Sequence, residues 1–469
     1  MQHVDIVPLQ LDRFEAILDA KDYRRFTESM ERGARCLRGH ALWCVNSTPK
    51  GGGVAEMLSS LMGYLAGAGI DARWLVIEGD DEFFDVTKRI HNHLHGESGD
   101  GGPLGEEERR IYERSLSPSS KELRGLVDPG DVVILHDPQP AGLVAAAKAT
   151  GATVVWRCHI GVDEPNSAVR GAWDFLRPFL QDADAAVFSR RAYVWGGLDG
   201  QRVEVIMPSI DALSPKNQAL DPKDAAAILH EAGIVPNGPM RKAEFERQDG
   251  TRGAITRRAH MVEDEPVPAS APLVTQVSRW DRLKDPIGVL RGFAEHVAER
   301  TEAHLVLAGP RVEGVADDPE EAEVARDVER ERDQLPGEVK ARVHLASLPL
   351  DDEEENSAMV NALQRAADVV VQKSLAEGFG LTVAEAMWKG RPVVAADVGG
   401  IRDQIVHDES GLLVDPTDLE TFGRAVTELL EDRERAERLG RAARDRIREE
   451  FLPTRHLRQY AELLLDLRS

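Results

Sequence analysis

The chain has little of what secreted or membrane-embedded proteins carry. It has three cysteines in 469 residues, Cys36, Cys44 and Cys158, and their spacing forms neither a CxxC pair nor a metal-binding pattern. We therefore expect free thiols in a reducing compartment. No apolar run is long enough to cross a bilayer, and the first residues lack the basic segment, apolar core and cleavage site of a secretory leader. The sequence predicts a cytoplasmic protein.

An excess of basic residues is also missing. The chain carries 58 Lys and Arg against 82 Asp and Glu, a formal net charge of -24. This balance disfavours nucleic-acid partners and an anionic membrane surface, so an anionic substrate would need a local basic pocket. The length of 469 residues predicts two or more domains. We expect small-molecule partners only, with a homodimer left open.

Two nucleotide-binding fingerprints are absent as well. Gly51, Gly52 and Gly53 lie between a predicted strand and a predicted helix, but they form no GxGxxG, and no GK[ST] follows them. A dinucleotide oxidoreductase is therefore disfavoured. Glycines at this place let backbone N–H groups approach a diphosphate, although an ordinary tight turn explains them as well.

What the chain does contain is an alternation of short apolar strands and helical segments in both halves. Strands are expected at residues 41–48, 71–79, 131–140, 152–161, 185–190, 203–209, 272–280, 303–310, 342–348, 368–374 and 392–398. This alternation predicts an α/β protein with a doubly wound sheet in each half. We place the domains at 1–215 and 216–452, with a surface insertion at about 233–270 and a final helix at 453–469.

The most informative segment lies between residues 377 and 400. Glu377 follows a predicted buried strand, two glycines permit a tight turn, and a helix is predicted at 381–389. Glu385 lies one turn into this helix, roughly 6 Å along its axis. The helix N-terminus is a seat for an anion. Two glutamates at this spacing are common by chance, but their setting matches the order of sugar, diphosphate and ribose in a nucleotide-sugar.

Cations and polar groups follow other predicted strands. Arg279 and Lys284 lie in VSRWDRLKDP, directly after a strand. Two cations there would stabilise the charge that develops on a leaving diphosphate, although surface cations after a strand are common. His159 ends a strand in the first half, and the loop HDPQP, with Asp137 and Gln139, ends its neighbour. Polar groups at adjacent strand ends predict an acceptor pocket.

Glu377, seven residues and Glu385 match the motif of the retaining, nucleotide-sugar-dependent glycosyltransferases of family 4, which this chain resembles. The step from Arg279 to Lys284 is similar to the family's phosphate-binding pair, with Ser278 where the family has glycine. The segments FFDVTKRIHNHLHG, HDPQP, RCHIGVDEPN and SPKN resemble the glycosyltransferring trehalose synthases and the retaining trehalose phosphorylases. Outside the insertion the resemblance spans nearly the whole chain. It implies a GT-B fold, with two Rossmann-like domains facing across a cleft and the last helix crossing back.

The resemblance also implies a role for each matched residue. Glu377 would bind the sugar hydroxyls together with backbone N–H groups of Gly378, Phe379 and Gly380. The other roles are Leu381 and Thr382 for the diphosphate, Arg279 and Lys284 for the leaving group, Glu385 for the ribose, His159 for the donor sugar, Gly51, Gly52 and Gly53 for the donor phosphates, and Asp137 and Gln139 for the acceptor. No side chain stands out as a covalent nucleophile, which fits the front-face mechanism proposed for the family; double displacement stays open.

The activity implied is reversible transfer of glucose from a nucleoside diphosphate glucose (NDP-glucose) to the anomeric hydroxyl of free glucose, giving α,α-trehalose. A phosphorylated acceptor is disfavoured because no Arg or Lys cluster marks the acceptor loops. A trehalose phosphorylase, another family-4 glucosyltransferase and an epimerase of the same fold stay open, and a non-catalytic binding protein fits least. The motifs require no cofactor. We predict no metal site, since HNHLHG lacks metal-ligand spacing; divalent-metal dependence and the nucleoside stay open.

Overall fold

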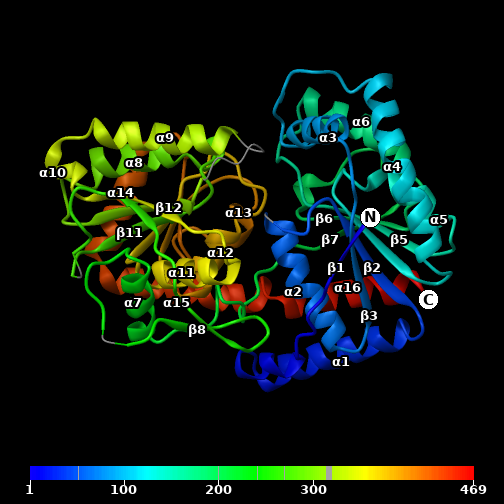
Figure 1. The fold of residues 1–469 in the computed structure, drawn as a ribbon, viewed down its shortest axis with the longest axis horizontal. Helices are drawn as coiled ribbons and strands as arrows, with labels where there is room; N and C mark the ends of the chain where they lie inside the picture. Colours follow the sequence, from blue (N-terminus) through cyan, green and yellow to red (C-terminus); the bar gives the residue numbers. More distant parts are fainter. Residues whose placement is uncertain (51, 199, 240, 269, 313–318) are drawn as a thin grey trace. The chain divides into compact units, whose positions relative to one another are not determined.

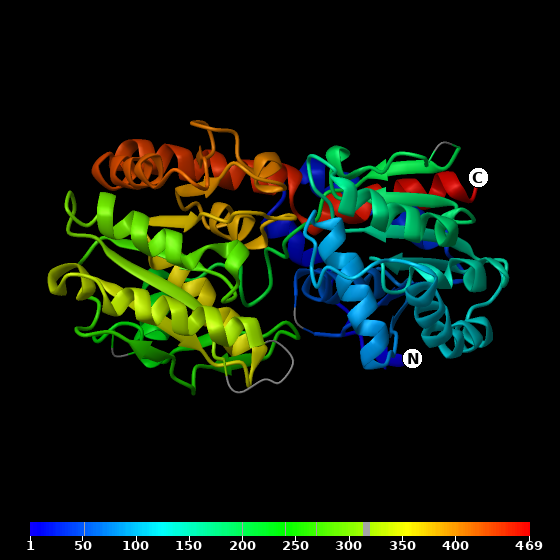
Figure 2. The same cartoon turned by 90° about the horizontal axis from the view of Figure 1, so that it is seen from above.

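A computed structural model of the chain describes residues 1–50, 52–198, 200–239, 241–268, 270–312 and 319–469. The chain forms two compact units. Unit 1 comprises Met1–Ser209 and Phe451–Ser469, and unit 2 comprises Ile210–Glu450. Each unit has a largely parallel sheet with helices on both faces (Figure 1, and from above in Figure 2). The predicted α/β class with two Rossmann-like units is confirmed.

Unit 1 contains a sheet with the strand order β1-β3-β2-β4-β5-β6-β7. Its strands are β1 (Gln2–Val4), β2 (Ala41–Asn46), β3 (Asp71–Val76), β4 (Val132–His136), β5 (Thr153–Cys158), β6 (Ala185–Phe188) and β7 (Arg202–Val205). β1 pairs antiparallel with β3 at one edge, and the other neighbours are parallel. Every residue of β2, β4 and β6 is buried, because helices cover both faces of a parallel sheet.

Helices surround this sheet, and the last of them comes from the end of the chain. They are η1 (Leu11–Ala16), α1 (Ala20–Cys36), α2 (Gly53–Gly67), α3 (Asp81–Leu94), α4 (Glu106–Leu126), η2 (Ala141–Leu143), α5 (Val144–Lys148), α6 (Ser167–Leu180), η3 (Arg191–Tyr193) and α16 (Pro453–Leu467). α16 packs on α1 and α2 and buries Leu457, Leu463 and Leu464. Nδ1 of His456 lies 2.9 Å from Oγ of Ser209, which ties the returning helix to the last residue of the first segment.

Unit 2 contains a second sheet with the order β10-β13-β12-β11-β14-β15-β16, and a separate pair, β8-β9. The strands are β8 (Glu244–Glu246), β9 (Arg252–Ala254), β10 (His260–Val262), β11 (Leu273–Val277), β12 (His304–Pro310), β13 (Val343–Leu348), β14 (Val369–Gln372), β15 (Val393–Ala396) and β16 (Leu412–Val414). β10 is the antiparallel edge strand. The other neighbours in the large sheet run parallel, so their carboxyl ends meet at one edge.

The helices of unit 2 form two layers. They are α7 (Pro222–Glu231), η4 (Arg282–Lys284), α8 (Pro286–His296), α9 (Pro319–Asp333), α10 (Gly337–Lys340), α11 (Glu353–Ala366), α12 (Leu381–Trp388), α13 (Ile401–Gln404), α14 (Leu419–Glu431) and α15 (Arg433–Glu450). Side chains of α8, α9 and α14 share one core with the sheet, and side chains of α7 and α11 share the other. No helix in the described ranges is both long and apolar enough to span a membrane.

The segment 233–270, predicted as a surface insertion, contains regular structure in unit 2. It contains the β8-β9 hairpin and the edge strand β10, and it buries Phe245 (4% exposed) and Ile255 (5%).

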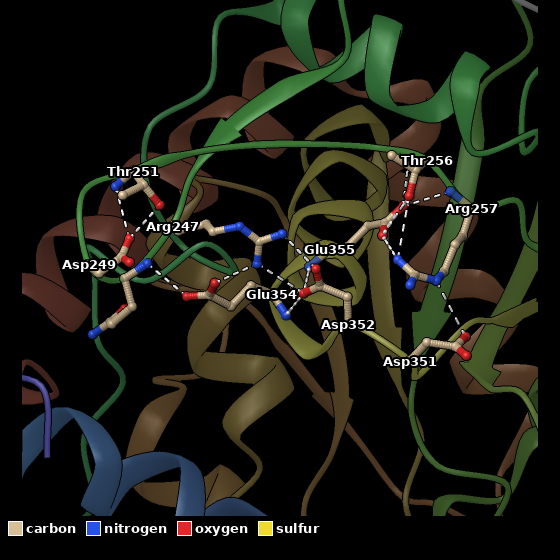
Figure 3. Close-up of polar contacts among 10 residues, drawn as sticks. Arg247, Asp249, Thr251, Thr256, Arg257, Asp351, Asp352, Glu354 and Glu355 are labelled. Carbon is tan, nitrogen blue, oxygen red and sulfur yellow. Dashed lines mark hydrogen bonds and ion pairs between the residues drawn. The ribbon is translucent and has the colours of Figure 1, made fainter. Parts of the chain in front are cut away.

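Two arginines of this segment contact the acidic first turn of α11 (Figure 3). Arg247 lies 2.6 Å from Asp352 and 2.8 Å from Glu354. Arg257 lies 2.5 Å from Glu355, whose side chain is 2% exposed. The polar composition of the segment reflects this docking onto residues about a hundred positions later in the chain.

Candidate active site

A glycine turn joins β14 to α12 in unit 2 and carries the first predicted carboxylate. Gly380 has φ 87 and is the N-cap of α12. A Cβ there would lie 3.2 Å from Cγ of Glu377 and 3.2 Å from Ile401, so the position requires glycine. Gly400, which sequence analysis did not single out, is equally constrained: a Cβ would lie 2.5 Å from the carbonyl oxygen of Gly378. The turn therefore holds its backbone at the start of the helix.

Lys284 and Glu377 come together in this turn. Nζ of Lys284 donates a 2.5 Å hydrogen bond to Oε2 of Glu377, and Oγ of Ser374 lies 3.3 Å from the same oxygen. The lysine side chain is 21% exposed and the carboxylate 10%. The structure thus brings together a predicted sugar-binding carboxylate and a predicted phosphate-binding cation, 93 residues apart in sequence.

A buried ion pair fixes the segment that carries Lys284. Lys373, which follows β14 and has a 1% exposed side chain, pairs with Asp285 and donates a 2.6 Å hydrogen bond to the carbonyl of Pro416. Asp285 has φ 48 and caps α8 through a 3.0 Å bond from the N–H of Gly288. Sequence analysis missed this pair. The sequence feature that could have indicated it is Lys373, directly after a strand predicted to be buried, where an unpaired charge would be costly.

Arg279 is not brought to this pair. Its guanidinium lies 3.0 Å from Asp281 and 3.5 Å from Glu321, and its side chain is 56% exposed. The two predicted cations therefore have different partners. Lys284 contacts Glu377, whereas Arg279 contacts Asp281 and Glu321.

The helix N-terminus and the second carboxylate occupy the expected order along α12. The N–H groups of Leu381 and Thr382 belong to the first turn, where backbone donors have no helical acceptor. Oγ1 of Thr382 donates a 3.0 Å bond to Oε1 of Gln372, which fixes the turn to β14. Glu385 is 1% exposed, and its Oε1 lies 3.7 Å from Nζ of Lys216.

In unit 1, a strained turn follows β4. Asp137 has φ 68, and its Oδ1 accepts a 2.7 Å hydrogen bond from the N–H of His159. The indole N–H of Trp156 donates to its carbonyl at 3.0 Å. Burial raises the pKa of Asp137 to about 7. Asp137, predicted to bind the acceptor, is thus engaged with the backbone of the predicted donor-binding histidine. Gln139 is half-buried in the same loop.

His159 is paired with a second histidine. Nδ1 of His136 lies 3.1 Å from Nε2 of His159, and the rings are stacked. Burial, reinforced by the charge of Arg157, lowers the pKa of His136 to about 3 and that of His159 well below its ordinary value. Both rings are therefore neutral near pH 7, and Nε2 is the nitrogen of His159 that faces His136. Sequence analysis quoted His136 only as part of HDPQP.

A charge pair follows the neighbouring strands. Arg190, after β6, pairs with Asp163, after β5; their side chains are 11% and 24% exposed. Because β5 and β6 are parallel neighbours, this pair lies at the same edge as His159. Neither residue was singled out in the sequence.

The predicted glycine loop is described only in part. Gly51 lies outside the described residues. Gly52 has φ 94 and is the N-cap of α2, which begins at Gly53. α2 is thus the next helix after β2, and its N-cap Gly52 has a backbone conformation that favours glycine.

No group of three or more His, Cys, Asp or Glu side chains in the described part of the chain is placed to hold a metal ion.

The fold and these contacts define a class. Among solved structures, an α,α-trehalose-phosphate synthase (UDP-forming) from Burkholderia xenovorans in complex with glucose-6-phosphate aligns with a TM-score of 0.66 at 14% identity, over 92% of this chain and 100% of that one. The protein has a GT-B fold.

The family follows from sequence comparison. Residues 44–195 match the trehalose synthase N-terminal domain, and residues 258–446 match glycosyl transferases group 1. The trehalose synthase of Pyrococcus horikoshii is 34% identical over 462 residues, covering 98% of this chain and 96% of that protein. The trehalose synthase of Rubrobacter xylanophilus is 35% identical over 433 residues, covering 92% and 91%. The chain belongs to the trehalose synthase family, and it is a glycosyltransferase of that type.

Proposed function

We propose that the protein is a retaining glucosyltransferase that moves glucose from an NDP-glucose to the anomeric hydroxyl of free glucose, forming α,α-trehalose reversibly. The observation that carries the proposal is the 2.5 Å contact between Lys284 and Glu377 at the start of α12, in a chain of the trehalose synthase family. Glucose, trehalose and the NDP-glucose are the partners we propose.

The donor roles follow from the chemistry of unit 2. Glu377 accepts hydrogen bonds from hydroxyls of the transferred sugar. Nζ of Lys284, beside it, is placed for the phosphate whose bond to the sugar breaks. The first-turn N–H groups of α12 and the dipole of this eight-residue helix stabilise the diphosphate. Arg279 supplies a second cation once it leaves Asp281 and Glu321. Charge held in place before the reaction is the largest catalytic contribution such a site offers.

The proton transfer belongs to the substrates. The departing phosphate oxygen takes the proton of the acceptor hydroxyl as the new glycosidic bond forms on the same face, so the configuration is retained. His159 binds the transferred sugar as a neutral hydrogen-bonding group. Its depressed pKa, caused by burial, supports this role over that of a cation.

The acceptor is proposed to be an uncharged sugar. The pairing of Arg190 with Asp163 supports it, because the guanidinium at this edge of unit 1 already faces a carboxylate. Asp137 and Gln139 hold the loop where hydrogen bonds to hydroxyls would form. A phosphorylated sugar would need a cation that is not neutralised.

Free thiols support a reducing compartment. Cys44 and Cys158 are buried and Cys36 is half-buried, and all three are free. We propose the cytoplasm, and we propose that turnover needs no divalent metal.

One experiment tests the reaction. The protein is incubated with glucose and, in turn, UDP-, ADP- and GDP-glucose, with and without a chelator, and the purified product is examined by proton NMR. We expect a non-reducing disaccharide with both anomeric carbons in α linkage. A reducing end or a β anomer would reject trehalose synthesis. Trehalose cleavage by inorganic phosphate, but not by a nucleoside diphosphate, would establish a phosphorylase instead.

A further inference from the structure

The SPKN motif lies in unit 2, beside the second glutamate of the donor motif. Residues 214–217 belong to unit 2 and not to the acceptor loops of unit 1. Its lysine, Lys216, extends to the second carboxylate of the donor motif, with Nζ 3.7 Å from Oε1 of Glu385. The two side chains are 20% and 2% exposed. A motif with no assigned role thus lies at the nucleotide end of the donor helix.

The neighbouring residues of the motif are fastened to that helix. Oδ1 of Asn217 accepts a 2.9 Å bond from Nζ of Lys389, and its carbonyl accepts a 3.1 Å bond from the indole N–H of Trp388. Nδ2 of Asn361, on α11, donates a 3.0 Å bond to the carbonyl of Pro215. These bonds flank Lys216 on both sides along the chain, so the orientation of its backbone toward α12 is built into unit 2.

We propose that Lys216 is a positioning residue of the nucleotide site: its ammonium holds and aims the Glu385 carboxylate, and thereby makes donor binding depend on the two hydroxyls of a ribose. The proposal rests on the proposed function, in which Glu385 holds the ribose. The new element is Lys216, which positions that glutamate.

The physical reason is the burial of Glu385. An ionised carboxylate with a 2% exposed side chain loses its hydration, and a nearby cation offsets that loss. Only the ionised form offers acceptors on both oxygens for two adjacent hydroxyl donors. Lys389 is also close, but its ammonium donates to Asn217, to Gln364 and to the main-chain carbonyl of Glu385. Lys216 brings its ammonium to 3.7 Å from a side-chain oxygen of this carboxylate.

The test compares two ligands in three proteins. Whichever of ADP, GDP and UDP binds tightest is titrated calorimetrically, together with its 2′,3′-dideoxy analogue, into wild type, Lys216→Met and Lys216→Arg. In wild type we expect the dideoxy analogue to bind ~30-fold more weakly, as for loss of hydrogen bonds to a charged group. In Lys216→Met we expect the penalty to fall to ~3-fold or less, because the natural nucleotide is weakened selectively. Lys216→Arg should retain most of the penalty, since it keeps the charge.

Lys340→Met is the matched control. The side chain of Lys340 is 24% exposed and pairs with Asp333 at 2.9 Å. Lys340 precedes β13 and therefore lies at the amino-terminal end of that strand, whereas Glu377 and α12 follow the carboxyl end of β14. In Lys340→Met, the loss of affinity for the dideoxy analogue relative to the natural nucleotide should equal that of wild type. An unchanged penalty in Lys216→Met, or equal weakening of both ligands, would overturn the positioning role and leave the proposed reaction intact. Wild type that binds no nucleotide, or ignores the missing hydroxyls, would overturn the donor assignment as well.

Discussion

His159 and His136 lie side by side at the ends of β5 and β4, and Asp137 holds the backbone of the first of them. At the residue scale, these three polar residues of unit 1 therefore contact one another. Each of the three has a buried environment that shifts its pKa toward the neutral form. Burial thus disfavours the charged forms of these three side chains at this end of the sheet.

The Asp137 carboxyl makes a pH prediction. Its pKa is raised by burial from 3.8 to about 7 in the folded protein, so above about pH 4 the unfolded chain is ionised while the folded one still binds a proton. Stability relative to Asp137→Asn should therefore fall as pH rises from about 4 to 7, by at most ~1.4 kcal/mol per unit. Calorimetric unfolding at pH 5 and pH 8 measures the difference between the two proteins. A pH-independent difference would show that the carboxyl is not perturbed.

Lys284 and Arg279 make a kinetic prediction. Lys284→Ala should lower turnover ~10²- to 10³-fold, as expected when a preorganised charge at a leaving group is lost. Arg279→Ala should also lower turnover, and the double variant should fall by less than the product, since both act on one charge. Steady-state kinetics with saturating glucose measures this. Unaltered turnover in Arg279→Ala would show that its pairing with Asp281 and Glu321 persists during catalysis.

At the scale of elements, α12 depends on the turn that precedes it. Gly380→Ala places a Cβ at φ 87 and 3.2 Å from Glu377, so we expect a stability loss of ~1–3 kcal/mol and impaired nucleotide binding. Gly390→Ala is the control, because Gly390 follows the same helix at φ 70 and a Cβ there meets its nearest atom at 3.7 Å. It should lose stability without losing nucleotide affinity. Equal nucleotide affinities in the two variants, measured calorimetrically, would contradict the role of the turn.

The β8-β9 hairpin offers a second prediction at this scale. Arg247→Ala removes the pairs with Asp352 and Glu354, and we expect ~1 kcal/mol less protection of the hairpin amides. Arg252→Ala, on the same hairpin, removes an 86% exposed side chain and should change nothing measurable. Hydrogen exchange of residues 244–254 compares the two. Similar protection in both variants would show that burial of Phe245 and Ile255 suffices to hold the hairpin.

Long apolar strands were predictable, and strands of three residues were not. Each of the eleven expected strand segments overlaps an observed strand. β1, β10 and β16 have three residues each, too few for a periodic signal, and the first two owe their existence to an antiparallel partner elsewhere in the chain. In the site, residue types indicated carboxylates and cations, but not which would meet. Lys216 reaches Glu385, and Arg279 turns to Glu321, because of tertiary packing that no local pattern encodes.

At the scale of the whole molecule, unit 1 depends on a helix from the far end of the chain. Leu464→Asp would place a charge where α16 is buried against α1 and α2, and we expect the unfolding transition of unit 1 to drop by several degrees. Asp466→Ala, which loses only a 63% exposed ion-pair partner of Arg202, should leave it unchanged. Scanning calorimetry distinguishes the two. A drop confined to the transition of unit 2 would contradict this assignment of α16.

Because α16 follows all of unit 2 in the chain, the order of synthesis differs from the order of the units. All of unit 2 has been made before residues 451–469 exist, although unit 1 began first. Domains fold as units while the chain emerges, so unit 2 completes its core early. The sheet of unit 1 waits for α16, and the apolar side of α1 and α2 stays uncovered until residues 453–467 have been made. The first unit to be started is thus the last to be finished.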